Sequence, residues 1–443
     1  MLSQKILSIF LIFTLPSYII SAPSSHSKCP KLGANEPLIK YNVLLKTSSA
    51  NYDSVVKNHF EMLQECLQKE KINVHKFDFS SVKDTKNDNA IFDFSVNGMI
   101  AGYTTTFTKS FVVDYLSKLD DVELVEADGV IKNAFDIGIS NSTGFERRAE
   151  RDATNIPNLD RIDQEKYPLD NKYKYPDSAG TGVDIYVLDT GIYLDHEEFQ
   201  GRGGTTLVEK SFCDEITDDD GHGTNVASII AGKTYGVANK ANLIGIKIAG
   251  KTCPITSQNI INGITYVMQH KKDNPDKKIV INLSAVNRNG DEALKTVARQ
   301  AVAAGIHFIA GAGNDNRDAC LYAPGAVETV ITVAATKITI PPNRQDWATE
   351  FTNWGKCVTI FAPGVDIQAA GIGSTSEIVK TVGTSVAAPH VTGAMALILA
   401  DGDLDYDPEQ AKAKLLSYAT KDQIKGLDYR PTANLLLRVP PIN

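Results

Sequence analysis

Short apolar runs separated by amphipathic segments constrain the fold of this chain more than any other feature. Runs that are apolar throughout form strands buried on both faces, which requires a mostly parallel sheet with helices on either side. The expected strands are residues 183–189, 242–248, 278–284, 307–313, 330–336 and 357–361, and the expected helices are residues 223–231, 257–270, 292–304 and 385–399. The sequence therefore predicts an α/β domain over residues 155–443.

Three polar residues lie at the ends of these expected elements. Asp189 closes a strand before a Thr-Gly turn, His222 lies between two glycines at the start of a helix, and Ser385 begins the last helix. A serine hydroxyl becomes a nucleophile when a nearby base takes its proton and a third group orients that base. Each feature alone is common, since a Gly-His-Gly sequence is more often a structural turn. Together the three features predict a nucleophilic site.

The chain order Asp, His, Ser is that of the subtilisins and differs from that of chymotrypsin and the α/β-hydrolases. The surrounding sequence resembles the subtilisin-like serine proteases of the proteinase K subfamily. The motifs that carry the resemblance are Asp189-Thr190-Gly191, His222-Gly223-Thr224, Gly311-Ala312-Gly313-Asn314, Gly383-Thr384-Ser385 and Ala387-Ala388-Pro389-His390, with residues 159–164 and 231–237 resembling that subfamily in particular.

The resemblance implies a serine endopeptidase that acts on proteins or peptides. Ser385 would be the nucleophile, His222 its general base and Asp189 the group that orients His222. Asn314 would donate to the oxyanion together with the Ser385 backbone N–H, although a Gly-Asn pair alone is also typical of a turn. The implied substrate-binding residues are Ser284, Ala285, Val286, Gly311, Ala312 and Gly313, and the implied disulfides are Cys213–Cys253 and Cys320–Cys357.

Residues 1–22 have the pattern of a signal peptide, because Lys5 precedes an apolar run that ends in small residues. The alternative is an uncleaved membrane anchor, but the run is short for a membrane span. We therefore expect no span after cleavage, and a protein that is secreted or lies in the lumen of the secretory or vacuolar pathway, where cysteines can be oxidised.

Residues 23–133 resemble the inhibitor-type propeptide of subtilases. Two amphipathic helical patterns and expected strands at 41–46, 73–79, 91–96 and 122–126 follow the ferredoxin-like, split βαβ order of a small α+β domain. An unrelated α+β domain is the alternative. As a propeptide, the segment would template the catalytic domain and then act as its intramolecular inhibitor.

Residues 134–154 are rich in Ser, Asn, Gly and charged residues, which is typical of an exposed linker. Self-cleavage is expected within or near this linker. Arg147-Arg148 also offers a site for trimming by another protease, so the sequence does not identify the bond that is cut. Asn141 lies in a glycosylation sequon on the linker. A second sequon at Asn282 lies on an expected buried strand and is not expected to be used.

The charge balance and the acidic loop before His222 limit the partners. The chain has 45 basic and 53 acidic residues and a net charge of -8, which argues against nucleic acid or an anionic membrane as the main partner. No cofactor is expected, and the protein is expected to be a monomer. Residues 218–220 are typical of a solvated loop. They leave a structural calcium ion open, although Thr359 stands where a proteinase K relative has a calcium-binding aspartate.

Several positions depart from the family pattern. Asn225 replaces a usual histidine, and residues 284–286 read Ser-Ala-Val in place of Ser-Leu-Gly, which should narrow the pocket for the residue before the cleaved bond. On the other side of the expected peptide-binding cleft, residues 253–255 include a proline, and proline cannot donate a strand hydrogen bond. Small or slender apolar residues are therefore the expected preference. His196 and His390 are expected to cap a loop and to pack in the core.

Two functions remain open on these observations. The first is a secreted, self-processing serine endopeptidase, favoured by the lack of an appended domain after about residue 435. The second is a subtilase that cuts itself once, retains its propeptide and acts by binding, favoured by the narrowed cleft. A lipase or esterase is a distant third, because no Gly-x-Ser-x-Gly motif surrounds Ser385.

Overall fold

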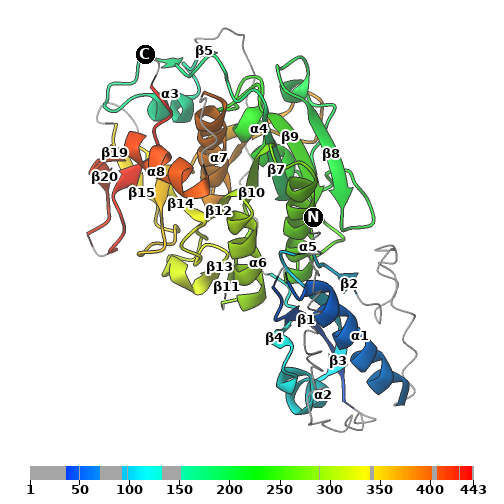
Figure 1. The fold of residues 1–443 in the computed structure, drawn as a ribbon. Coiled ribbons are helices and arrows are strands. Elements are labelled where there is room, and N and C mark those ends of the chain that lie inside the picture. Colours follow the sequence, from blue (N-terminus) through cyan, green and yellow to red (C-terminus); the bar gives the residue numbers. More distant parts are fainter. Residues whose placement is uncertain are drawn as a thin grey trace, which may run out of the picture.

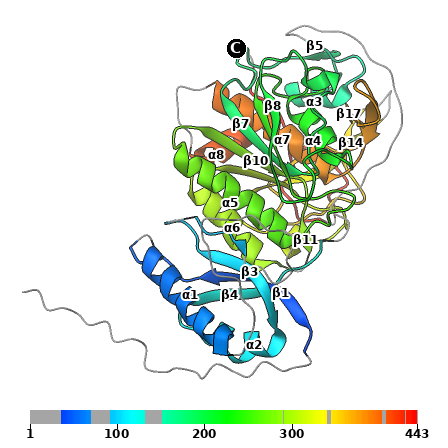
Figure 2. The ribbon, with the colours of Figure 1, turned by 90° about the vertical axis from the view of Figure 1, so that its right-hand side faces the viewer.

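The computed structural model describes residues 36–131, apart from 49, 70–91 and 97, and residues 151–441, apart from 289, 340–343, 402–406 and 429. Within these ranges the chain forms a small N-terminal unit and a large α/β unit, which lie against each other (Figures 1 and 2). The predicted signal peptide, the strand expected at 73–79, Asn141 and most of the predicted linker lie outside the described residues.

The N-terminal unit is a four-stranded antiparallel sheet in the order β2-β3-β1-β4. This is the strand order of a split βαβ unit. Its described elements are β1 (Leu38–Leu45), α1 (Tyr52–Lys69), β2 (Phe92–Asp93), β3 (Gly102–Thr108), α2 (Lys109–Asp114), a 3-10 turn (Leu116–Lys118) and β4 (Val122–Ala127).

The strand prediction for this unit was wrong at its centre. The central strand β3 was not predicted, and the strand expected at 91–96 is only the short edge strand β2. The sequence of β3 is rich in threonine, so it lacks the apolar signal of a buried strand. The structure satisfies one buried hydroxyl by pairing Thr104 Oγ1 with Asn42 Oδ1 at 2.7 Å, so a polar strand can occupy the middle of the sheet.

The large unit contains a mostly parallel sheet in the order β19-β21-β16-β14-β12-β10-β7-β9-β8, with β15 paired to β14 and β20 paired to β15. The α/β prediction is thus confirmed. The strands of this sheet are β7 (Val183–Asp189), β8 (Thr206–Ser211), β9 (Asn242–Lys247), β10 (Lys278–Leu283), β12 (His307–Gly311), β14 (Ile331–Ile338), β15 (Asp346–Ala348), β16 (Ile360–Pro363), β19 (Thr420–Lys421), β20 (Ile424–Lys425) and β21 (Leu435–Leu436).

Helices cover both faces of this sheet (Figure 1). Three short two-stranded sheets lie outside it: β5 (Arg151–Asp152) with β6 (Lys172–Tyr173), β11 (Asn287–Arg288) with β13 (Tyr322–Ala323), and β17 (Ile367–Ala370) with β18 (Ile378–Thr381). The helices are α3 (Pro157–Asp163), α4 (His222–Ala231), α5 (Ser257–Asp273), α6 (Glu292–Ala303), α7 (Thr384–Ala400) and α8 (Pro408–Tyr418), with 3-10 turns at Glu197–Phe199 and Ala319–Leu321.

Alternate residues of each central strand face two separate cores. On β7, Ile185 and Val187 pack in the core formed with α4, α7 and α8, whereas Tyr186 and Leu188 pack in the core formed with α5 and α6. Because both sets are buried, the strand reads as an uninterrupted apolar run. This arrangement holds the carboxyl end of β7, and with it Asp189, inside the protein.

The N-terminal unit covers α5 and α6. Val43 and Leu45 of β1 pack against α1 in the unit's own core, whereas the intervening Leu44 joins the core that contains α5 and α6. Figure 2 shows the N-terminal sheet directly below these two helices. The two units therefore share a hydrophobic interface.

The upstream boundary of the large unit differs from the prediction. Arg151 and Ala153 are buried, and β5 pairs with β6, so the last residues of the expected exposed linker 134–154 belong to the folded unit. Arg151 is held by contacts with backbone carbonyls and aromatic rings, which a composition rich in polar residues does not reveal.

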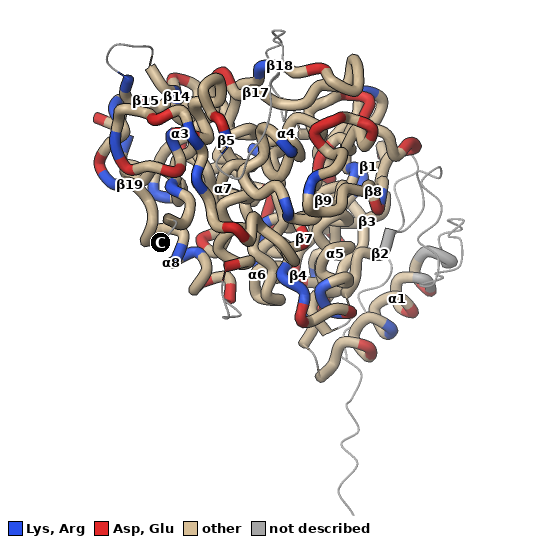
Figure 3. Tube along the Cα trace, turned by 90° about the horizontal axis from the view of Figure 1, so that it is seen from above, with Lys and Arg blue, Asp and Glu red and all other residues tan. Residues whose placement is uncertain are grey.

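Charged residues of both signs are spread over the described part of the chain (Figure 3). No helix among the described residues is both long and apolar enough to cross a membrane. Figure 3 thus shows charged residues spread over a protein whose helices cover its sheets.

Candidate active site

Asp189 and His222 meet inside the large unit. The Nδ1 atom of His222 lies 2.7 Å from Oδ1 of Asp189, and both side chains are fully buried. The same carboxylate oxygen accepts a hydrogen bond from the backbone N–H of Thr190 at 2.8 Å. Burial raises the pKa of Asp189, while the His222 ring and the Thr190 N–H act in the opposite direction. The structure therefore brings together the predicted acid and base.

Glycine makes this approach of strand and helix possible. A Cβ atom at Gly223 would lie 2.2 Å from the carbonyl oxygen of Gly191, so the start of α4 touches the turn after β7 at a position that admits no side chain. Gly221, directly before His222, has a φ of 105°, a backbone conformation that other residues rarely adopt. These positions explain why the sequence places glycines on both sides of the histidine.

Asp218 holds the two segments in place. Its carboxylate accepts five hydrogen bonds, from the Thr190 hydroxyl, the Thr224 hydroxyl and the backbone N–H groups of residues 220, 221 and 224. Asp218 is 9% exposed, so the prediction of a solvated loop was wrong for this residue. All its partners are hydrogen-bond donors within the fold, which explains why an acidic residue occupies a buried position.

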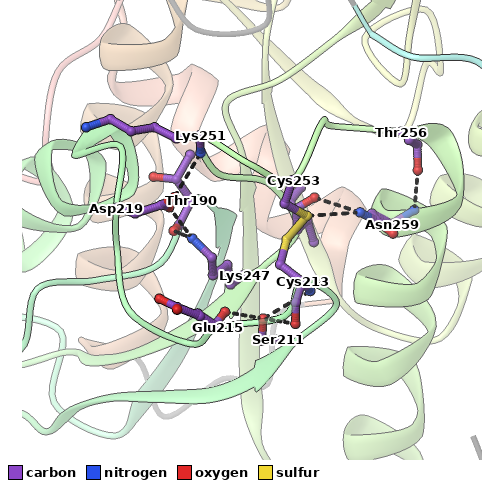
Figure 4. The surroundings of a disulfide bond; sticks show 11 residues. Thr190, Ser211, Cys213, Glu215, Asp219, Lys247, Lys251, Cys253, Thr256 and Asn259 are labelled. Atoms are coloured by element: carbon purple, nitrogen blue, oxygen red, sulfur yellow. Dashed lines mark hydrogen bonds and ion pairs between the residues drawn. A yellow bond between two sulfur atoms is a disulfide. The ribbon is translucent and has the colours of Figure 1, made fainter. Parts of the chain in front are cut away.

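An ion pair between a buried lysine and a half-buried aspartate extends this network. Lys247 ends β9 with its side chain 2% exposed, and its Nζ atom lies 2.7 Å from both the Thr190 carbonyl oxygen and Asp219 Oδ1. Asp219 also accepts from the backbone N–H of Lys251 at 3.0 Å (Figure 4). Sequence reasoning missed Lys247, although a lysine within an apolar strand signals a buried partner.

Ser385 lies in the first turn of α7. It is 1% exposed, and its backbone carbonyl accepts a hydrogen bond from the Ser284 hydroxyl at 2.8 Å. Helix α7 packs against α4, which begins at His222, and against β10 and β12. Among the described residues, the Ser385 hydroxyl has no hydrogen-bond partner.

Asn314 faces the same place as Ser385. Its Oδ1 atom accepts from both the backbone N–H and the hydroxyl of Thr384 at 2.9 Å, which directs its amide nitrogen the other way. A Cβ atom built on Gly383 would lie 2.9 Å from Ser385 Oγ and 3.3 Å from Asn314 Nδ2. Both polar groups therefore lie beside the same point next to Gly383.

The predicted substrate-binding residues lie on two chain segments beside this position. Ser284 and Ala285 are buried, and Val286 is half-buried, in the segment that follows β10. The Val286 side chain lies against Gly313, since a Cβ built on Gly313 would be 3.3 Å from Val286 Cγ2. Ala312 is fully buried, and Gly311 lies close to Thr384. Val286 thus occupies space between the two segments.

The structure contains both disulfides that the resemblance implied, Cys213–Cys253 and Cys320–Cys357. The first joins the loop after β8 to the loop before α5, close to the Asp219–Lys247 pair (Figure 4). Asn259, in the first turn of α5, places its amide 3.8 Å from Cys253 Sγ and 3.1 Å from the Ile248 carbonyl.

The edge that contains Pro254 still pairs with an extended segment. The Ile131 N–H donates to the Ile255 carbonyl at 3.0 Å, and the Ser257 N–H donates to the Gly129 carbonyl at 3.3 Å. Pro254 precedes both bonded residues, so its missing N–H removes neither contact.

Two carboxylates of the N-terminal unit reach the two helices that it covers. Glu126 accepts from the Ala293 N–H at 2.9 Å, and Asp128 accepts from the Gln258 N–H at 2.8 Å. These N–H groups lie in the first turns of α6 and α5, where donors lack partners within the helix. The N-terminal unit therefore contacts the large unit by polar as well as apolar groups.

Other polar residues singled out in the sequence serve the fold. His390 is buried between the Val386 carbonyl and Asn158, and burial lowers its pKa to about 4. His196 caps the 3-10 turn that begins at Glu197. Asn225 donates to the Ala370 carbonyl at 2.6 Å, a contact between α4 and β17. Asn282 is fully buried and bonded to Thr392, so the second sequon is inaccessible.

Metal-binding groups are absent from the part of the chain that the structure describes: no three His, Cys, Asp or Glu side chains are placed to hold an ion. Asp220 accepts from the His222 N–H, so each residue of the acidic run binds a protein donor. The hydroxyl of Thr359 accepts from the Thr332 N–H at 3.2 Å. The calcium alternative gains no support from these contacts.

A parallel α/β sheet with Asp, His and Ser at the ends of its elements, in that chain order, defines the subtilisin-like serine proteases as the class. Residues 180–431 match the subtilase family, so the chain belongs to this family. A crystal structure of a cold-adapted subtilisin-like serine proteinase has a TM-score of 0.57 and 35% identity, over 65% of this chain and 99% of that chain.

Named relatives point to the same family. Cerevisin of Saccharomyces cerevisiae is 32% identical over 440 residues, covering 89% of this chain and 66% of the relative. Alkaline protease 2 of Aspergillus fumigatus is 34% identical, covering 77% of this chain and 69% of the relative. An extracellular serine proteinase of a Thermus species is 41% identical, covering 64% of this chain and 65% of the relative. The chain thus spans about two thirds of the length of these relatives.

Proposed function

We propose that this chain is a secreted or vacuolar serine endopeptidase, made as a zymogen that cuts itself. Ser385 attacks the carbonyl carbon of a peptide bond, and His222 takes the hydroxyl proton and gives it to the leaving amine. The observation that carries the proposal is the 2.7 Å contact between His222 Nδ1 and Asp189 Oδ1 in a fully buried site. A carboxylate on Nδ1 leaves Nε2 as the base and stabilises the imidazolium that forms.

Asn314 and the Ser385 backbone N–H stabilise the negative charge on the substrate oxygen in the transition state. This role is supported by the two Thr384 donors on Asn314 Oδ1, which turn the amide N–H₂ toward the side where Ser385 Oγ lies. The N-terminus of α7 adds its partial positive charge at the same place. Neither contribution needs a metal or a cofactor.

Residues 23–133 act as the propeptide of this enzyme and, before release, as its inhibitor. The capping contacts of Glu126 and Asp128 and the strand pairing of Ile131 with Ile255 support this role, because they direct the chain after β4 along the large unit. Self-cleavage then falls within residues 132–150, upstream of the buried Arg151. Asn141 in this segment is a glycosylation acceptor.

The enzyme prefers small or slender apolar residues before the cleaved bond. Val286 supports this preference, because its side chain fills space against Gly313 where the family pattern has a glycine. Ser284, Ala285 and residues 311–313 form the remaining wall of this pocket. Profiling of a peptide library tests the preference, which fails if bulky aromatic residues are cut best.

A second candidate is a subtilase that retains its propeptide and acts by binding. The hydrophobic contact of the N-terminal unit with α5 and α6 favours it, because Leu44, Phe94 and Ile131 are buried in a common core with these helices. Separation of the two units would expose that apolar surface to water. The two candidates differ in whether the pro-segment leaves.

The test compares the purified full chain with its Ser385→Ala variant and with Ser376→Ala, which changes an exposed serine. The parent and Ser376→Ala should shorten on a gel and digest an added unrelated protein, and Ser385→Ala should do neither. A parent that cuts itself but spares the added protein, with the pro-segment still bound, would support the second candidate. Self-cleavage by Ser385→Ala would refute the nucleophile assignment.

A further inference from the structure

A basic cavity lies outside the proposed active site. It has a volume of about 350 Å³, and ten residues from β5 and from the loops around residues 175–179, 201–203 and 233–240 line it. Four of them are the cations Arg151, Arg202, Lys233 and Lys240, and the one acidic lining residue is Asp177. None of the lining residues belongs to the Asp189, His222, Ser385 and Asn314 set.

Arg151 provides a fixed positive charge at this cavity. Its side chain donates to the carbonyl oxygens of Lys233 at 3.2 Å, Thr234 at 3.0 Å and Gly236. Its guanidinium also stacks 4.9 Å from the centre of the Tyr175 ring. Arg151 is 5% exposed, so its charge is held in place by neutral partners away from bulk water.

Arg202 repeats this arrangement on the other side of the lining. Its guanidinium donates to the carbonyl of Ala241 at 2.5 Å and to the hydroxyl of Thr206 at 2.6 Å and 3.0 Å. Burial lowers the pKa of Arg202 to about 10, with no carboxylate acting in the other direction. Such a shift is the effect expected for a cation that lacks a negative partner.

The charge of these two arginines is not balanced within the described residues. Every partner of Arg151 and Arg202 among these residues is a neutral oxygen or a ring, and neither side chain forms an ion pair with a carboxylate there. Carbonyl groups satisfy N–H donors but carry no net charge, so a positive potential remains over the cavity. A bound anion would remove this imbalance.

We propose that this cavity binds a small multiply charged anion of the phosphate class. The ammonium groups of Lys233 and Lys240, half-buried and exposed, make the direct contacts, while Arg151 and Arg202 supply the field. Gly203 lies against the Lys240 stem, since a Cβ there would be 2.5 Å from Lys240 Cγ. The Lys240 Nζ atom donates to the carbonyl of Asp177 at 2.9 Å, which holds the ammonium group at the cavity lining.

The size of the cavity favours a ligand larger than one inorganic phosphate. A water molecule takes about 30 Å³ of liquid volume, so the space corresponds to roughly ten waters. Tyr175 and Ala179 give the lining an apolar part. An oligophosphate or a phosphorylated organic molecule fits this combination of charge and apolar surface. Binding would join β5 to the loops at 201–203 and 233–240, so the ligand should stabilise the fold.

Thermal unfolding of the Ser385→Ala full chain tests this proposal without self-digestion. Inorganic phosphate, tripolyphosphate, glucose 6-phosphate and citrate are compared with sodium chloride at one ionic strength. Tripolyphosphate should raise Tm by several degrees in a saturable way, because a ligand that binds only the folded state stabilises it. A larger rise with glucose 6-phosphate would identify an organic phosphate, and a rise with citrate alone would overturn the phosphate assignment.

Two double variants decide whether the effect arises in the cavity. Lys233→Gln with Lys240→Gln should lose most of the Tm rise, whereas Lys421→Gln with Lys425→Gln, which removes the same charge from an exposed edge, should keep it. The single variants should each lose part of it, which covers the case of a double variant that does not fold. An equal Tm rise in both double variants, or no rise above chloride, would refute the proposal.

Discussion

The Oδ1 atom of Asp218 lies 2.8 Å from the hydroxyl of Thr190, the residue directly after Asp189. The other oxygen of Asp218 binds the backbone N–H of Thr224, two residues after His222. One buried carboxylate therefore joins the strand end that carries the acid to the helix that carries the base. We infer that Asp218 is a positioning residue for His222 and Asp189.

Asp218→Asn should lower kcat by about 100-fold, because displacement of a catalytic group by about 1 Å costs that much. KM should change little, since Asp218 lies behind the acid and base. Asp214→Asn, an exposed change in the same loop, is the control. An unchanged kcat in Asp218→Asn would contradict the positioning role.

Asn314→Ala should lower kcat by about 100- to 1000-fold, the range measured for loss of the same kind of donor in subtilisin. KM should stay nearly constant, because the donor acts on charge that develops in the transition state. Steady-state kinetics with a peptide ester measure both constants. Asn314→Asp keeps the contact size but removes the donor, so it should be equally inactive; a fully active Asn314→Asp would exclude the oxyanion role.

Val286→Gly should widen the pocket beside Gly313. Removing the side chain deletes the Cγ2 atom that lies 3.3 Å from the Cβ position of Gly313. The ratio of kcat/KM for a phenylalanine substrate over an alanine substrate should rise by about 10- to 200-fold, the range for small changes of volume in an apolar pocket. Val286→Ala should give an intermediate ratio. An unchanged ratio in both variants would mean that Val286 lies outside the pocket.

Release of the pro-segment should depend on pH through Glu126. Burial, the largest cause, and the nearby Asp291 raise the pKa of Glu126 to about 7, and the Ala293 N–H opposes this rise. The other charged groups at this contact are Asp128, with Lys40 beside it, and Glu292, which pairs with Lys295. A raised pKa in the bound state means that association is strongest near pH 4 and weakens as the pH rises through 7.

Size-exclusion chromatography of the self-cleaved protein measures this dependence. The fraction of pro-segment that co-elutes should fall between pH 5 and pH 8. Glu126→Gln still offers an oxygen to the Ala293 N–H but does not ionise, so the fall should be smaller in this variant. Glu123→Gln, an exposed change on the same strand, should behave as the parent. A parent with constant co-elution from pH 5 to pH 8 would rule out this effect.

Loss of the Cys213–Cys253 disulfide should destabilise the loop before α5. The bond closes a loop with a sequence separation of 40 residues, and the chain-entropy estimate for such a loop is about 4 kcal/mol. Cys213→Ala with Cys253→Ala should therefore lower the Tm, and should weaken the contacts of Lys251 and Ile255 more than the Cys320→Ala, Cys357→Ala pair does. Hydrogen exchange of the Lys251 N–H, which donates to Asp219, and of the Ile131 N–H, which donates to the Ile255 carbonyl, checks the local effect.

The central strands could be predicted because burial on both faces leaves a continuous apolar run. Val183–Asp189 was predicted with the bounds of β7, and α4 and α7 each begin one residue earlier than expected. The edge strand β8 was not predicted, because Thr206–Ser211 alternates between half-buried and exposed residues. Helix α8 was also missed, although Asp407 and Gln410 form a capping box at its start.

The polar network behind the site was not predictable in the same way. Asp218 and Asp219 lie in a run that is typical of a solvated loop. Lys247 is distant from them in the sequence, and only the fold brings Lys247 to Asp219. Motifs identify residues that act on substrate, whereas supporting residues depend on contacts between distant segments. The segment around Ile255 shows the same limit, since its sequence does not reveal that Ile255 and Ser257 pair with residues 129–131.

Because Gly223 lies against the Gly191 carbonyl, this site is sensitive to a substitution that adds no polar or charged group. Alanine differs from glycine by one methyl group, which carries no charge and titrates at no pH. At position 223 that carbon would lie 2.2 Å from an oxygen of the neighbouring turn, so the helix would have to move away from the strand. An inherited Gly223→Ala allele would then encode a chain with every polar group of the site intact and no working enzyme.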